Sequence, residues 1–148
     1  HCGFIHSSII TESMFILGKR SRDNLDQVHP DLILVVGRAI CISEIDFGVI
    51  EGARTIAEQQ TMIDKGASSL KNPKSSRHVI SEVSGYCHAV DVMAYLDGKG
   101  RWDWPLYDKI ALAFKQASKE LKIPIEWGGD WRTFKDGPHF QLPKKQYR

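Results

Sequence analysis

The stretch SRHVISEVSGYCHAVD, residues 76–91, is the part of the sequence around which the fold is organised, together with DGPH at residues 136–139. The first stretch supplies an imidazole at His78 and a carboxylate at Asp91. The second begins with a carboxylate and ends with the imidazole of His139. Two distant pieces of chain therefore offer His, Asp and His, with one more Asp beside them.

This residue set suits a metal site with an open position. Catalytic zinc is usually held by three ligands drawn from His, Asp or Glu, and its fourth position is left to a water whose pKa it lowers to about 7. His78, Asp91 and His139 are predicted to be the ligands. Asp136 would accept a proton from that water and pass it to a leaving amine. The Gly-Pro pair between Asp136 and His139 favours a tight turn that brings both to one pocket.

Asp91 interrupts residues 89–94, which otherwise read as an apolar strand buried on both faces. A carboxylate buried there is costly unless it is paired or bound to a metal. The alternative is a buried Asp whose oxygens accept from backbone amides or an arginine. Short zinc signatures such as H-E-x-x-H or paired C-x-x-C do not occur. Spacing by itself therefore leaves both interpretations open.

Several short motifs occur in a recognisable order: Gly52-Ala53-Arg54-Thr55, Gln59, Ser76-x-His78, Ala89-Val90-Asp91 and Asp136-x-x-His139. This order resembles the LAS metallopeptidases, family M15. The family includes D-Ala-D-Ala carboxypeptidases and dipeptidases, and the L-alanyl-D-glutamate endopeptidases that bacteriophages use as endolysins. The chain looks most like the phage endolysin branch, and the resemblance covers roughly residues 17–142.

The resemblance implies an α+β fold, in which helices pack on a small antiparallel sheet and a zinc cleft lies at the sheet, as in LAS or hedgehog-like metallopeptidases. It implies that His78, Asp91 and His139 bind one zinc ion. Asp136 would be the catalytic base. Arg54 would bind the substrate or steady the oxyanion of the tetrahedral intermediate, for which a planar guanidinium is suited.

Three further residues are candidates for binding the substrate or supporting the ligands. Gln59 lies about one turn after Arg54 on a predicted helix, and Ser76 could orient the histidine two residues later by a hydrogen bond. Trp131, with Trp127, could line a groove for a peptide stem or a glycan. The alternatives are a solvated glutamine, a loop serine without such a role, and tryptophans of the core.

The spacing departs from the family pattern S-x-H-x-x-G-x-A-x-D, which places His and Asp seven positions apart. Here His78 and Asp91 are thirteen apart. The extra residues, around 80–84, predict a loop insertion before Gly85. His88, three residues before Asp91, is an alternative ligand, but Asp91 has the Ala-x-Asp context of the family.

The function that the resemblance implies is hydrolysis of the bond between L-Ala and D-Glu in the stem peptide of bacterial peptidoglycan, which lyses the host cell. One rival is a D-Ala-D-Ala carboxypeptidase or dipeptidase on the same fold. A second is a non-catalytic wall-binding module. A third is a structural zinc protein, in which four ligands, with Cys or His among them, would close the site.

Composition sets limits on partners. With 148 residues, 42% hydrophobic and 26% charged, the chain is typical of one globular domain. The formal net charge of +2 excludes strong electrostatic capture of nucleic acid and is compatible with an anionic cell-wall polymer. No run of 18 apolar residues predicts a membrane span. We expect a monomer.

The N-terminal residues 1–13 lack a structural period and begin with His, so we expect a non-native or disordered extension with Met14 as the natural start. Residues 14–148 would form one catalytic peptidase domain without a separate wall-binding domain. No signal-peptide core is recognisable. The protein is therefore expected to stay in the host bacterial cytoplasm until it is released to the wall.

Three cysteines, an odd and sparse number, favour free thiols in a reducing compartment. Cys87 lies next to the proposed site in sequence and could be a thiolate ligand or a nucleophile. The alternative is a small, partly buried residue.

Periodicity and turn residues predict the secondary structure. A short helix is expected from Ser21. Longer helices are expected over 30–42, over 56–65 with Thr55 as N-cap, and over about 105–121. Strands are expected over 46–51, 89–95, 125–127 and 140–142, with a turn at 97–100.

Overall fold

The computed structural model describes residues 15–148, so the predictions for residues 1–13 and for Met14 lie outside the described part. The elements are, in chain order, α1 (Lys19–Asn24), α2 (Pro30–Ile42), β1 (Asp46–Glu51), α3 (Ile56–Asp64), the 3-10 turn η1 (Pro73–Ser75), β2 (Ala89–Leu96), β3 (Lys99–Arg101), α4 (Trp104–Leu121), β4 (Glu126–Trp127), the 3-10 turn η2 (Gly128–Asp130) and β5 (His139–Gln141).

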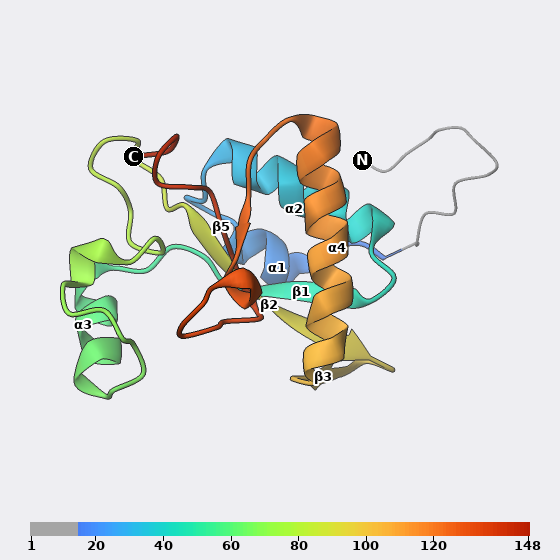
Figure 1. The fold of residues 1–148 in the computed structure, drawn as a ribbon, viewed down its shortest axis with the longest axis horizontal. Coiled ribbons are helices and arrows are strands. Elements are labelled where there is room, and N and C mark those ends of the chain that lie inside the picture. Colours follow the sequence, from blue (N-terminus) through green and yellow to red (C-terminus); the bar gives the residue numbers. More distant parts are fainter. Residues whose placement is uncertain (1–14) are drawn as a thin grey trace.

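Strand β2 is the centre of the sheet. It pairs along one side with β1, and its other side is shared by β3 at one end and β5 at the other. β4 pairs with β5, which gives the order β1-β2-β5-β4, and every pairing is antiparallel. The predicted α+β class with a small antiparallel sheet is confirmed (Figure 1).

The β2–β3 hairpin follows from its two-residue loop. Asp97 and Gly98 both have positive φ, 52° and 77°. A turn with two positive φ angles matches the right-handed twist of antiparallel strands, and Asp-Gly is a favoured pair for it. The predicted turn therefore closes a hairpin.

Helix α2 begins where the sequence predicts. Pro30 is its first residue, and the Nδ1 of His29 accepts a hydrogen bond from the backbone N–H of Asp31 at 3.0 Å. The apolar residues on one side of the helix are all buried: Leu32, Val35, Val36, Ala39 and Ile40. This face packs against α4.

Helix α4 covers the sheet through its aromatic residues. Phe114 stacks on Phe140 of β5 with ring centroids 3.8 Å apart, and it lies 5.5 Å from the ring of Phe47 on β1. Leu121, the last residue of the helix, is 37% exposed, so the buried side of α4 ends before it.

Helix α3 lies at the side of the sheet away from α4 (Figure 1). Its start is a capping box: Thr55 Oγ1 accepts from the N–H of Glu58 at 3.0 Å, and Glu58 Oε1 accepts from the N–H of Thr55 at 2.8 Å. These contacts satisfy two backbone donors that a helix start otherwise leaves without partners. The predicted N-cap at Thr55 is confirmed.

The cysteines differ from the prediction. Cys41 is disulfide-bonded, so the expectation of free thiols is wrong for this residue. An odd number of cysteines requires only one of them to stay unpaired and does not exclude a disulfide. Cys87 is free and buried.

Within residues 15–148, no helix has both the length and the apolar character needed to cross a membrane.

Candidate metal centre

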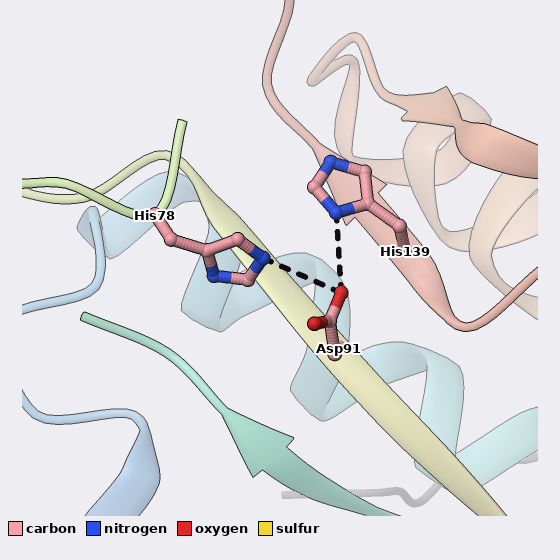
Figure 2. A group of neighbouring side chains, drawn as sticks. All are labelled: His78, Asp91 and His139. Carbon is pink, nitrogen blue, oxygen red and sulfur yellow. Dashed lines mark hydrogen bonds and ion pairs between the residues drawn. The ribbon is translucent and has the colours of Figure 1, made fainter. Parts of the chain in front are cut away.

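The side chains of His78, Asp91 and His139 converge at one point (Figure 2). His78 Nε2 lies 3.3 Å from Asp91 Oδ1, and His139 Nδ1 lies 3.1 Å from the same oxygen. One donor atom from each residue falls within 4.8 Å of the other two, a group that could hold a metal ion. Asp91 and His139 are 48 positions apart, so two distant segments of chain supply the set that the sequence predicts.

The sheet positions two of the three residues. Asp91 on β2 and His139 on β5 are partners across the antiparallel ladder, so their side chains leave the same face. Asp91 is 24% exposed, and Met93 on that face is also half-buried. The expectation of a strand buried on both faces is therefore wrong, because one face opens onto a cleft at Asp91.

The third residue, His78, comes from a loop that is fixed by backbone hydrogen bonds. The N–H of Arg54 donates to the carbonyl of His78 at 2.8 Å, and the N–H of His88 donates to the carbonyl of Arg77 at 2.8 Å. The loop is thus held between the chain after β1 and the chain before β2. These two hydrogen bonds hold the imidazole of His78 beside the sheet.

Each imidazole has one ring nitrogen engaged away from the group. His78 Nδ1 donates to the carbonyl oxygen of Gly52 at 2.9 Å, which leaves Nε2 toward Asp91. His139 Nε2 donates to Gln141 Oε1 at 2.7 Å, which leaves Nδ1 toward Asp91. Histidines that bind metals usually donate their other N–H in this way. The donor set therefore fits a divalent ion.

The electrostatics favour an ionised carboxylate at the centre. Burial raises the pKa of Asp91, but the charge of His78 and hydrogen bonds from both histidines outweigh it and hold that pKa well below its ordinary value. Burial lowers the pKa of His139, but its contacts with Asp91 and Gln141 and the nearby charge of Asp136 raise the pKa above the ordinary value. The site therefore attracts positive charge.

Asp136 lies in the wall of the same cleft. The N–H of His139 donates to the carbonyl of Asp136 at 3.3 Å, which closes the predicted tight turn. The N–H of Asp136 donates to the carbonyl of Gly128 at 3.0 Å. Burial raises the pKa of Asp136, as does the charge of Asp91, while the two histidines lower it less. A carboxyl group whose pKa is raised binds a proton more readily than an ordinary aspartate does, which suits a group that accepts a proton and returns it.

Gly128 is required for this position of Asp136. A Cβ built at Gly128 would lie 2.3 Å from the carbonyl oxygen and 2.9 Å from the Cβ of Asp136. Only glycine permits such a close approach of two backbone segments. The predicted corner at residues 128–131 therefore has a packing role beside the site.

Arg54 and Gln59 form a buried pair in the cleft wall. Arg54 Nη1 donates to Gln59 Oε1, and Arg54 Nη2 lies 3.2 Å from Glu51 Oε1. Gln59 Nε2 in turn donates to Ser68 Oγ at 3.1 Å, and Gln59 is 1% exposed. The solvated alternative for Gln59 is wrong, since its amide holds the guanidinium of Arg54.

Ser76 and Trp131 also border the cleft. Ser76 is buried and its Oγ accepts from the backbone N–H of His78 at 3.2 Å, so it contacts the main chain rather than the ring. The ring of Trp131 lies 5.2 Å from that of His139, with the planes tilted by 49°. Trp127 is buried in the core. The two tryptophans thus divide between the two predicted alternatives.

The cleft has a volume of about 850 Å³ and runs from α3 and the loop after it to the segment 131–136. The His–Asp–His group lies in its floor. The predicted position of a cleft at the sheet is confirmed. Its size is that of sites that hold a peptide-sized ligand.

His88 lies outside the group. Its Nε2 is 2.9 Å from Ser84 Oγ, and its ring packs 5.6 Å from that of His29. Burial lowers its pKa to about 4, with smaller effects of the charges of Arg77 and His29. The extra residues 80–83 line a second pocket with His88 rather than the metal cleft. The six-residue insertion therefore leaves the Asp91 geometry intact.

Cys87 is a buried thiol, and burial raises its pKa to about 11. It is protonated at neutral pH and cannot serve as a thiolate there. The alternative of a small buried residue is correct.

Two contacts of the site have no counterpart among the predicted residues. One is the Gly52 carbonyl that engages His78, and a backbone group leaves no signal in the sequence. The other is Gln141, which follows His139 by two positions on β5. The period of two in a strand places both side chains on one face, and this signal could have found it.

A small antiparallel sheet, a cleft with a His–Asp–His group and a carboxyl group with a raised pKa together define a metallopeptidase type of site. A family model described as "Phage L-alanyl-D-glutamate peptidase" matches residues 13–142. The chain belongs to this family, as the resemblance predicts.

Relatives from a phage and from bacteria support the assignment. The L-alanyl-D-glutamate peptidase of Escherichia phage T5 is 37% identical over 123 residues, 82% of this chain and 85% of that protein. The peptidoglycan L-alanyl-D-glutamate endopeptidase CwlK of Bacillus subtilis is 30% identical over 103 residues, 66% of this chain and 61% of CwlK. The crystal structure of Serratia marcescens L-Ala D-Glu endopeptidase ChiX matches with a TM-score of 0.78 and 43% identity, covering 90% of this chain and 95% of that one.

Proposed function

We propose that the chain is a zinc-dependent peptidoglycan hydrolase of the endolysin type, which cuts the bond between L-Ala and D-Glu of the stem peptide. The observation that supports this most is the His78–Asp91–His139 group in the floor of a peptide-sized cleft, in a chain of the L-alanyl-D-glutamate peptidase family. In this proposal residues 14–148 act as one monomeric catalytic domain on the bacterial wall, after release from the host cytoplasm.

Zinc is proposed from the donor set. Imidazole nitrogens and carboxylate oxygens are both ligands that zinc accepts, and three protein ligands leave one position of a tetrahedron for water or substrate. A bound zinc ion would polarise the peptide carbonyl and lower the pKa of a water. A structural zinc site would be closed by a fourth protein ligand, and within residues 15–148 the group contains three.

Asp136 is proposed as the general base and then the general acid. Its raised pKa means that its carboxylate binds a proton more readily than an ordinary aspartate does. In the cleft it would take a proton from the attacking water and give it to the amine of the leaving residue. Its backbone bonds to Gly128 and His139 would keep its carboxylate at the cleft wall during both transfers.

Arg54 is proposed to bind the oxygen that becomes negatively charged in the transition state. Gln59 and Glu51 hold two nitrogens of its guanidinium, which fixes the plane of the group before the substrate arrives. A charge that is oriented in advance stabilises a developing oxyanion without reorganisation. Ser76 would support His78 through the backbone, and the face of Trp131 would contact the peptide stem.

The near rival is a D-Ala-D-Ala carboxypeptidase or dipeptidase on the same fold. The names of the relatives favour the endopeptidase, because each protein reported above is named for the L-Ala–D-Glu bond. A non-catalytic wall-binding module is less consistent with a complete ligand set beside a carboxyl group whose pKa is raised.

The experiment that separates these functions is product analysis. Purified peptidoglycan is incubated with the zinc-loaded protein, and new amino termini and released fragments are identified by mass spectrometry. We expect new amino-terminal D-Glu and stems that keep their D-Ala. Free D-Ala with otherwise intact stems would establish the carboxypeptidase instead, and unchanged peptidoglycan would leave only the binding module.

A further inference from the structure

We propose that Glu126, an exposed residue of β4, acts through Gln141 to fix which ring nitrogen of His139 faces the metal group. Glu126 would then be a positioning residue outside the cleft. This inference rests on the metal site of the proposed function, and it assigns the control of that site to two residues outside the His78–Asp91–His139 group.

Hydrogen bonds connect three side chains across two strands: His139, Gln141 and Glu126. His139 and Gln141 are two positions apart on β5, so their side chains share a face. Glu126 is the partner of Gln141 across the β4–β5 ladder. Gln141 Oε1 accepts from His139 Nε2 at 2.7 Å, and Gln141 Nε2 donates to Glu126 Oε1 at 2.9 Å. Gln141 is 9% exposed and His139 is 7% exposed, so water competes little for either contact.

The carboxylate of Glu126 determines which end of the Gln141 amide faces His139. An ionised Glu126 only accepts hydrogen bonds, so the amide nitrogen of Gln141 must face it. The amide oxygen then has to face His139, and an oxygen there accepts only from a protonated Nε2. The remaining nitrogen, Nδ1, faces Asp91 at 3.1 Å, and it is the nitrogen that a cation would bind on displacing the Nδ1 proton. Without Glu126, either end of the amide could face the ring.

The other metal histidine is controlled differently. His78 donates Nδ1–H to the carbonyl of Gly52, a backbone oxygen that cannot rotate or exchange donor for acceptor. The ring of His78 is therefore fixed by the main chain. The ring of His139 depends on an amide that can turn by half a rotation. The Glu126–Gln141 pair is therefore the contact that sets which nitrogen of a ligand ring is protonated in a way that a side-chain substitution can change.

The simpler interpretation is that Glu126 and Gln141 are a cross-strand pair that stabilises the sheet edge. The two interpretations differ in what they predict for metal affinity. An edge pair contributes to folding stability alone. A pair that sets the protonated nitrogen of a ligand changes metal affinity, for which outer partners of ligands typically contribute 10- to 100-fold.

The test uses the full chain and zinc itself as the probe. Glu126→Gln keeps the shape of the side chain but allows the Gln141 amide to turn its nitrogen toward His139. We expect zinc affinity, measured by competition with a chromogenic chelator, to fall about tenfold or more. The visible absorption spectrum of the cobalt-substituted protein should change as well, and the unfolding of the metal-free protein should change little.

A matched control is available on α4. Gln116 Nε2 donates to Glu120 Oε2 at 2.9 Å, the same type of contact away from the cleft. Glu120→Gln, which also removes the contact with Arg38, should leave zinc affinity and the cobalt spectrum unchanged.

A double variant separates positioning from general damage. Glu126→Gln combined with Gln141→Glu exchanges the two groups: a carboxylate accepts from His139 Nε2, and the new amide donates to that carboxylate. We expect zinc affinity to return to the wild-type level or above. Unchanged affinity in the single variant, or no recovery in the double variant, would overturn the inference. A wild-type protein that binds no zinc would overturn the proposed metal site together with it.

Discussion

Asp91 and His139 are directly opposite each other in the β2–β5 ladder, and His139 Nδ1 lies 3.1 Å from Asp91 Oδ1. Strand register therefore sets the geometry of the candidate metal site. A slip of one residue would send His139 to the opposite face of the sheet, because side chains alternate along a strand. On the other side of β5, the register of the β4–β5 ladder brings Glu126 opposite Gln141.

Asp91→Asn tests the ligand set. The substitution keeps the shape of the side chain but removes the charge on which both histidines converge, so we expect zinc to be lost and hydrolysis of peptidoglycan to fall to the level of the metal-free protein. Zinc per chain is measured by elemental analysis after dialysis. Wild-type protein stripped with a chelator should recover on addition of zinc, and the variant should not. Full activity of the variant would rule out Asp91 as a ligand.

Asp136→Asn tests the proton transfer. We expect kcat to fall by about 10²- to 10⁴-fold, a typical contribution of a general acid–base group, with zinc content unchanged. The pKa of Asp136 is raised, so wild-type activity should decrease as the pH falls through that raised pKa and the base becomes protonated. This acidic limb of the pH–rate profile should be absent from the residual activity of Asp136→Asn. An unaltered kcat would exclude the proposed role.

Arg54→Lys tests the stabilisation of the oxyanion. Lysine keeps the charge but lacks the planar fork that Gln59 and Glu51 hold in place. We expect a loss of about 10²- to 10³-fold in kcat, the usual effect of removing an oxyanion contact, while zinc is retained. Because Arg54 is buried, thermal unfolding is measured in parallel. If KM rises and kcat does not change, Arg54 binds the ground state instead.

Gly128→Ala tests the close approach that supports Asp136. The added methyl group would lie 2.3 Å from the carbonyl oxygen of Asp136 and must displace that segment. We expect a loss of about 1–3 kcal/mol in the free energy of unfolding, the usual cost of overpacking, and a reduced kcat. Gly37→Ala, in helix α2 with no atom within 4 Å of the new Cβ, is the control and should be neutral or stabilising. Equal behaviour of the two variants would contradict the packing role.

His88 predicts a pH dependence of stability. Its pKa is lowered to about 4 in the folded protein, against an ordinary value of 6.5, so the unfolded chain binds a proton first as the pH falls. The stability contributed by a neutral His88 is present above pH 6.5 and is lost progressively toward pH 4. Between pH 7 and 5 this loss amounts to about 2 kcal/mol. Urea unfolding at both pH values should show a smaller difference for His88→Gln, and an identical difference would refute the assignment.

Local signals account for the parts of the fold that the sequence predicts well. Pro30 and Thr55 begin their helices through short-range contacts that are legible in a few residues. The type and order of His78, Asp91 and His139 point to a candidate ligand set, because only a few kinds of side chain bind metals, and the structure brings these three together. These features need no knowledge of which strands pair.

Long-range pairing explains what the sequence does not disclose. That Asp91 lies open to a cleft follows from the position of β5 and the His78 loop beside β2. The choice of nitrogen on His78 depends on the carbonyl of Gly52, and the place of Gln141 depends on register with Glu126. These pairings join segments that are distant in the chain, so composition does not reveal them, and the period of two on β5 relates Gln141 to His139 but not to Glu126.

Strand β5 has three residues, yet it lies inside the sheet, between β2 and β4. Asp91 and His139 are therefore anchored on two interior strands, whose backbones separate only when much of the molecule opens. His78 lies outside the sheet, on a loop held by the backbone hydrogen bonds of Arg54 and His88, so its displacement requires fewer contacts to break than separation of the strands does. Exchange of the ion with solution would therefore begin at His78, and its rate would report the opening of that loop rather than global unfolding.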